Sequence, residues 1–192
     1  TWTMVTFYHL KSILEMLEER YSCSWQSTKT ALKLLKDQII EATIRKDNNT
    51  LFDCNNVWYL PVINSMLKNL TDIAITYYQF LCHFDNDNDI IVNAFGDIMQ
   101  IVRMMTSDYT NRVNSNGNKH KNNHGKYTLS HGLFFTVNQI IKLCDVINNQ
   151  TYLNHALQEV EKFRSMWTSF PLSDVVTHLF YKGRYNYQKN NN

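Results

Sequence analysis

The segment from Leu60 to Leu81, LPVINSMLKNLTDIAITYYQFL, decides the fold class. Its apolar residues recur at alternating spacings of three and four, which is the period of an α-helix with one buried face. These residues are Leu60, Ile63, Leu67, Leu70, Ala74, Tyr77 and Leu81. Pro61 fits such a helix only in the first turn, where its missing N–H is not needed. We therefore predict one long amphipathic helix across this segment.

Five further segments share this spacing: Phe7 to Tyr21, Trp25 to Ala42, Ile91 to Met105, Phe134 to Cys144 and Leu153 to Phe170. No segment alternates in polarity as a strand does, and only five Gly and two Pro occur in 192 residues. Short connections make consecutive helices antiparallel neighbours. The sequence thus predicts an all-α fold, an up-and-down helical bundle of about six amphipathic helices with one long Asn-rich loop.

Each apolar stripe is expected to face the core of the bundle. In the first helix the predicted buried stripe is Phe7, Leu10, Leu14, Leu17 and Tyr21, and the predicted outer face is Lys11, Glu15, Glu18 and Glu19.

The length of 192 residues and the 44% hydrophobic content fit a single helical domain over residues 1–192. The long polar loop is expected at residues 107–130, since no other connection is as long. A basic polar tail is expected at residues 182–192. No apolar run approaches the roughly 18 residues that cross a bilayer, so we expect no membrane span.

Four cysteines suit a disulfide-containing chain from an oxidising compartment, and three connectivities are open. In an up-and-down bundle Cys23 and Cys82 reach the same end and Cys54 the opposite one. We predict a Cys23–Cys82 bridge, and Cys144 is expected to be a buried apolar residue. Glycosylation signals occur at Asn48, Asn69 and Asn149, a number that chance alone explains.

The candidate sites for metal ions and for anions match no complete binding motif. The run from Asp85 to Asp89 resembles half a calcium loop, but Ile90 stands where such a loop needs Gly, so a helix cap is the expected role. His120, His124 and His131 lack accompanying carboxylates, and we expect no metal site and no cofactor. The locally basic loop is a candidate anion-binding segment, with Arg112, Lys119, Lys121 and Lys126 as its cations.

No Gly-rich phosphate loop, nucleophile elbow or zinc-binding helix occurs, so we predict no catalytic residues and no enzyme. The first hypothesis is a secreted, non-enzymatic helical protein that binds another protein, either cytokine-like or a host-directed effector from a parasite, vector or virus. The first alternative is a carrier of a hydrophobic small molecule or lipid in the bundle interior. A second alternative is an intracellular viral helical adaptor. We do not expect a nucleic-acid partner, because the net charge of the chain is only +2.

Overall fold

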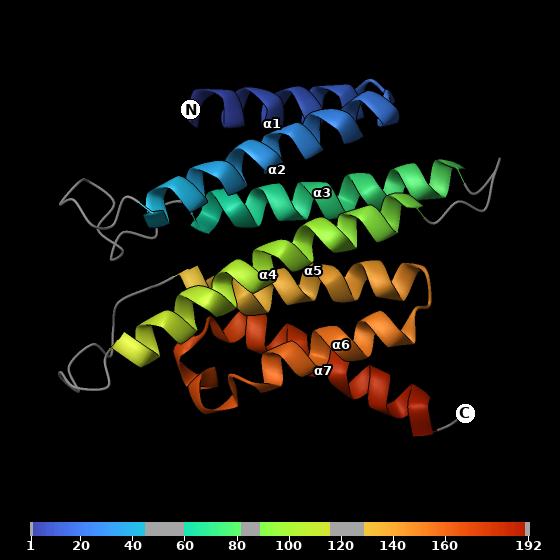
Figure 1. Ribbon diagram of the computed structural model, residues 1–192. Helices are drawn as coiled ribbons and strands as arrows, with labels where there is room; N and C mark the ends of the chain where they lie inside the picture. Colours follow the sequence, from blue (N-terminus) through green and yellow to red (C-terminus); the bar gives the residue numbers. More distant parts are fainter. Residues whose placement is uncertain (1, 45–59, 82–88, 116–128, 191–192) are drawn as a thin grey trace. The chain divides into compact units, whose positions relative to one another are not determined.

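The computed structural model describes residues 2–44, 60–81, 89–115 and 129–190, and these residues form helices and short turns with no strand (Figure 1). This confirms the all-α helical bundle, with seven α-helices in the described ranges where about six were predicted. The elements are α1 (Trp2–Leu17), α2 (Tyr21–Ile44), α3 (Leu60–Leu81), α4 (Asp89–Ser115), α5 (Leu133–Val146), α6 (Gln150–Glu161) and α7 (Leu172–Asn190), with 3₁₀ turns η2 (Leu129–Gly132) and η3 (Arg164–Ser169).

The helices group into two compact units. The first unit holds α1, α2, α3 and the start of α4 up to Gly96, and the second holds α4 from Asp97 onward together with α5, α6 and α7. That both units fold as the one domain expected from the chain length stays a prediction.

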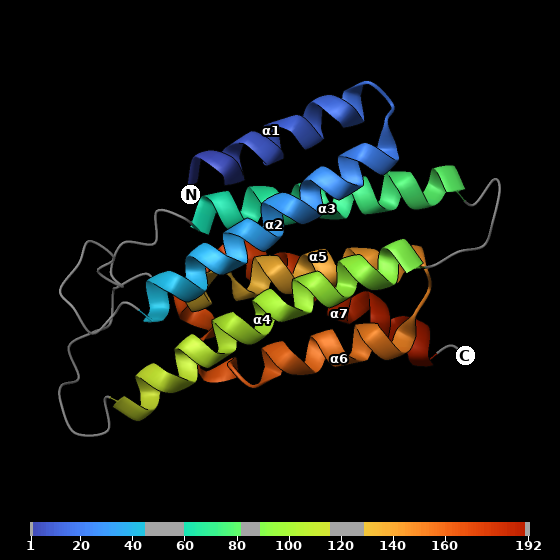
Figure 2. The same cartoon turned by 45° about the horizontal axis from the view of Figure 1, so that its top comes forward.

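In the first unit, α1 and α2 form an antiparallel hairpin, and α2 packs on α3 (Figure 2). The turn is a left-handed helix end at Glu19, whose φ is 58°. There the Arg20 N–H donates to the Glu15 carbonyl at 2.8 Å and the Glu19 N–H donates to that of Met16 at 3.0 Å. These two bonds satisfy carbonyls that the end of α1 would otherwise leave unpaired.

The core of this unit follows the predicted stripes of α2 and α3. On α2, every member of the stripe whose side chain the structure describes is buried. On α3, the middle of the stripe is buried and its two ends are half-buried. The buried members are Trp25, Leu32 and Leu35 on α2 and Ile63, Leu67, Leu70 and Ala74 on α3. The helical periodicity therefore assigned the inner faces of both helices correctly.

In the second unit, α5 is the central helix and packs against both α6 and α7. Ten of its 14 residues are buried, so it is enclosed on nearly every side. Its Phe134 ring lies 4.8 Å from that of Phe170 and 5.5 Å from that of Trp167, centroid to centroid. This aromatic cluster ties η3 to the start of α5.

Two expected boundaries are wrong. Helix α4 continues to Ser115, nine residues into the predicted loop of 107–130, because no Gly or Pro interrupts the chain between Gly96 and Gly117. Residues 116–128 of that loop lie outside the described residues. The predicted sixth helix divides into α6, which ends at Glu161, and η3.

The predicted tail is also wrong, because residues 172–190 form helix α7. Pro171 ends η3 and its carbonyl accepts the N–H groups of Asp174 and Val175, which opens the new helix. The inward face of α7 carries Val175, His178 and Tyr185, all buried, with Lys182 between the last two. Because His178 and Lys182 interrupt this stripe, the sequence of α7 does not show apolar residues at the helical period.

We expect Leu67→Ala and Leu70→Ala each to lower the free energy of unfolding by about 2–5 kcal/mol, because both side chains are fully buried. Lys33→Ala, at an exposed position of α2, should change it by about 0.5 kcal/mol or less. Chemical denaturation measures all three. Equal losses at the core and surface positions would contradict the assigned faces.

Candidate interaction surface

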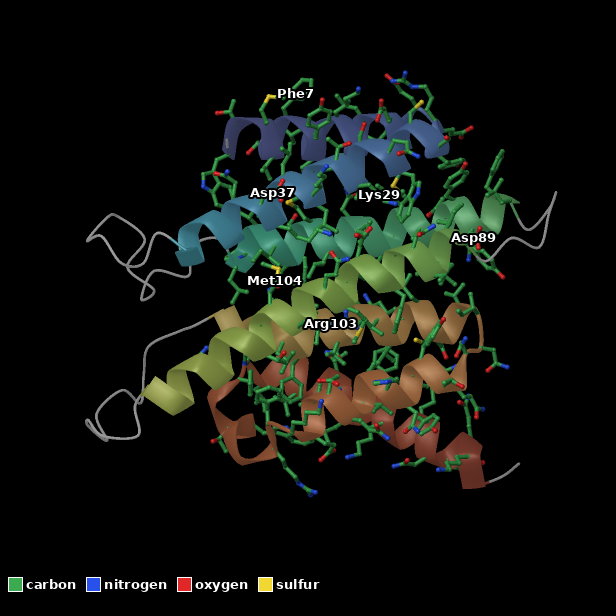
Figure 3. The ribbon with its side chains drawn as sticks, in the orientation of Figure 1. Phe7, Lys29, Asp37, Asp89, Arg103 and Met104 are labelled. Atoms are coloured by element: carbon green, nitrogen blue, oxygen red, sulfur yellow. The ribbon has the colours of Figure 1, made fainter. Side chains whose placement is uncertain are left out.

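Helix α1 turns its apolar stripe towards solvent. Phe7 is 54% exposed and Leu17 76%, and Figure 3 shows Phe7 on the side of α1 that faces away from α2 and α3. We call the exposed apolar residues of this helix the α1 stripe: Met4, Phe7, Leu10, Ile13, Leu14 and Leu17. The predicted burial of Phe7, Leu10, Leu14 and Leu17 is therefore wrong.

The face that α1 buries instead is mostly polar. Glu15 is only 4% exposed, and Ser27 of α2 donates its hydroxyl to Glu15 Oε2 at 2.6 Å. The Lys11 ammonium lies 3.7 Å from Glu15 Oε1. A carboxylate taken out of water costs several kcal/mol unless charged or hydrogen-bonding partners compensate it, and Glu15 has both.

Ser12 connects α1 to both neighbouring helices. Its carbonyl accepts the hydroxyl of Ser24 from α2 at 2.7 Å, and its Oγ accepts Asn69 Nδ2 from α3 at 2.9 Å. The Ser12 hydroxyl in turn donates to the His9 carbonyl at 2.7 Å. We call this set the polar seam: Ser12, Glu15, Ser24, Ser27 and Asn69.

The polar seam explains the orientation of α1. Ser24 and Ser27 are buried on the α2 surface that α1 covers, and both hydroxyls donate to partners on α1. A Leu face laid on the same surface would lose these two bonds between the helices, each worth about 0.5–1.5 kcal/mol. Matching polar groups therefore hold α1 in place, and its apolar side remains in water.

A second apolar face lies on α7, in the other unit. Leu172 is 76% exposed, and the further exposed members of this α7 stripe are Val176, Leu179, Phe180 and Tyr187. Gly183 lies on the same side of the helix, and a Cβ added there would meet no atom within 4 Å. Each unit thus presents one helix whose outer face is apolar.

The predicted glycosylation sites have different fates. Asn69 Nδ2, the atom that would carry a glycan, is the donor to Ser12, so the polar seam competes with modification there. Asn149 caps α6, where its Oδ1 accepts the Tyr152 N–H at 3.0 Å. Asn48 lies outside the described residues. Glycosylation of the three stays a prediction.

Cys23 is exposed and Cys144 is buried, and neither forms a disulfide with a described residue. Burial raises the pKa of the Cys144 thiol to about 12, so it stays protonated near neutral pH, as expected for a residue of the core. Cys23 borders a hollow of about 350 Å³ that is also lined by Tyr77, Phe80 and Leu81 at the end of α3. Cys54 and Cys82 lie outside the described residues.

The candidate anion-binding segment stays a prediction, because most of it lies outside the described residues. Arg112 belongs to α4, while Lys119, Lys121 and Lys126 fall in the undescribed range, as do His120, His124 and Asp85 to Asn88. Asp89 begins α4, and His131 lies in η2 with its ring 5.9 Å from that of Phe170. Among the described residues, no group of three His, Cys, Asp or Glu could hold a metal ion.

Sequence reasoning missed His178 of α7, which is fully buried and whose two ring nitrogens have no hydrogen-bond partner among the described residues. Its ring packs edge-on against Phe134 at 5.2 Å and Trp167 at 5.9 Å. Burial, with a smaller contribution from Lys182, lowers the pKa of His178 from 6.5 to about 4, although Glu161 opposes the shift. The imidazole is therefore neutral at neutral pH.

We expect His178 to make stability depend on pH. Between pH 6.5 and about 4 the unfolded chain binds a proton that the folded chain does not, so stability present above pH 6.5 is lost as the pH falls. The full loss is about 3 kcal/mol. Urea titrations across this range should show a smaller loss for His178→Phe. An identical pH dependence in both proteins would contradict the assignment.

No family model, curated protein or solved structure matches the chain. None of the helices in the ranges that the structure describes is both long and apolar enough to cross a lipid bilayer.

The polar seam predicts a reversed mutational pattern on α1. Ser27→Ala removes the hydroxyl that donates to the buried Glu15 and should lower the free energy of unfolding by about 1–3 kcal/mol. Leu14→Ala, on the exposed stripe, should cost the isolated chain about 0.5 kcal/mol or less. Both are measured by denaturation at low protein concentration. A larger loss for Leu14→Ala would show that the stripe faces inward.

Proposed function

We propose that this chain is a secreted, non-enzymatic helical protein, cytokine-like or a host-directed effector, that acts by binding another protein. One observation carries the proposal: each unit exposes an apolar helix face, the α1 stripe in the first and the α7 stripe in the second. The six exposed side chains of the α1 stripe present on the order of 600 Å² of apolar surface, at the upper end of what a monomer tolerates.

The magnitude of the apolar exposure supports a protein partner. Covering about 600 Å² at roughly 25 cal/mol per Å² is worth on the order of 15 kcal/mol before costs. Association costs about 4–15 kcal/mol in lost freedom of motion, which is a cost of similar size, so a net gain requires a partner that fits the stripe closely. The interior supports the carrier alternative less well, because the aromatic rings that it needs, such as Phe134 and Trp167, pack against one another.

Photo-crosslinking tests the proposed function. The full chain carries p-benzoylphenylalanine at Leu14 or Val176, one position in each stripe, and at Lys33 as an exposed polar control. The chains are added to intact animal cells and irradiated. We expect a saturable adduct with a different protein from at least one stripe, displaced by excess unlabelled chain, and none from Lys33. No such adduct at either stripe would contradict the proposal.

Secretion is tested through the cysteines. Since Cys23 and Leu81 border the same hollow, α3 ends beside Cys23, which supports the predicted bridge to the next residue, Cys82. Such a bridge closes a loop of about 60 residues and stabilises the chain by about 4 kcal/mol. We expect non-reducing peptide mapping of the alkylated protein, made in a secretory pathway, to recover the Cys23–Cys82 peptide. Four free thiols would instead favour the intracellular adaptor.

A further inference from the structure

Four residues of the α1 stripe have the spacing of a coiled coil, and from here on "the seam" means these four and not the polar seam. Phe7, Leu10, Leu14 and Leu17 follow one another at spacings of three, four and three, which is the spacing of the inner positions of a coiled coil. All four are exposed, with Leu10 at 56% and Leu14 at 59%. A seam of this spacing is suited to knobs-into-holes packing against another helix.

We propose that the occupant of the α1 stripe is a second copy of this chain, packed α1 against α1 in an antiparallel pair about a two-fold axis. The inference rests on the proposed function, in that it names the partner at one of the two surfaces. The α7 stripe is left free for a different protein. A two-fold interface uses the same patch on both copies, so this patch must be complementary to itself.

The spacing of the seam supplies that complementarity. The series three, four, three reads the same in both directions, so a reversed copy matches it layer by layer. Phe7 then lies opposite Leu17 of the second copy, and Leu10 lies opposite its Leu14. Each layer joins two large apolar side chains. The layers contain no polar side chain, so pairing leaves no buried polar group without a partner within them.

The charges beside the seam are already paired within each copy. Because Leu10 lies opposite Leu14, the two-fold axis passes residue 12, and Lys11 faces Lys11 of the second copy. The Lys11 ammonium lies 3.7 Å from Glu15 Oε1 of its own chain, and Glu18 forms an ion pair with Arg20. The groups that meet along this edge are therefore ion pairs and not single charges of one sign.

The area is also sufficient. Complete coverage of two α1 stripes, each on the order of 600 Å², removes about 1,200 Å² of surface from water, which is the lower limit of specific protein interfaces. The α1 helix is held to its own unit by the polar seam, so its backbone is already ordered before pairing. Association therefore orders few additional groups.

Light scattering coupled to size-exclusion chromatography tests the proposal on the full chain. We expect the wild-type chain to have twice the mass of one copy at micromolar concentration. Leu14→Glu should weaken the pair by about thirtyfold or more, because it places a charge within the seam. Leu172→Glu makes the same change on the α7 stripe and should leave the pair intact. Leu17→Glu provides a second seam variant if Leu14→Glu does not fold, which circular dichroism decides.

A wild-type chain that stays monomeric would overturn the proposal, and so would a pair that Leu172→Glu disrupts as strongly as Leu14→Glu. The failures of the two proposals are distinguishable. A monomer that still forms the photo-crosslinked adduct with a different protein at Leu14 leaves the proposed function standing. A pair of the expected mass without any such adduct supports the second copy and contradicts binding to another protein.

Discussion

The hydrogen bond from Ser27 to the buried Glu15 carboxylate sets the surface of the first unit. Together with the bonds that Ser12 receives from Ser24 and Asn69, it holds α1 by its polar side. Burying a carboxylate is unfavourable unless partners compensate it, so these contacts are specific to one orientation. A rotation of α1 about its axis would break them together. The exposed apolar stripe is the consequence of that constraint.

The two units differ in how far they bury their apolar side chains. In the second unit the central helix α5 buries residues on nearly every side, and its neighbours cover it with aromatic rings. In the first unit the outer helix contributes few apolar side chains to the core, among them Val5. The larger apolar side chains of α1 therefore lie on the surface, where they add little to the stability of the isolated chain.

The sequence predicted the helices of the core well, since their stripes face inward as the period of 3.6 requires. It failed at α1 because periodicity identifies an apolar face without showing what covers it. It failed at α7 because His178 and Lys182 interrupt the inward stripe, and the burial of a histidine depends on rings contributed by distant segments. The polar seam was equally hidden, because Ser12 and Asn69 lie 57 positions apart.

Nuclear Overhauser contacts between side-chain protons show which face of α1 packs on α2. We expect contacts from the β protons of Ser24 and Ser27 to Ser12 and Glu15, with none to the methyl groups of Leu10 and Leu14 within the same chain. Selective labelling of one chain in a mixed sample separates contacts within a chain from those between copies. Intramolecular contacts from Ser24 and Ser27 to the two leucines would show instead that α1 packs through its apolar face.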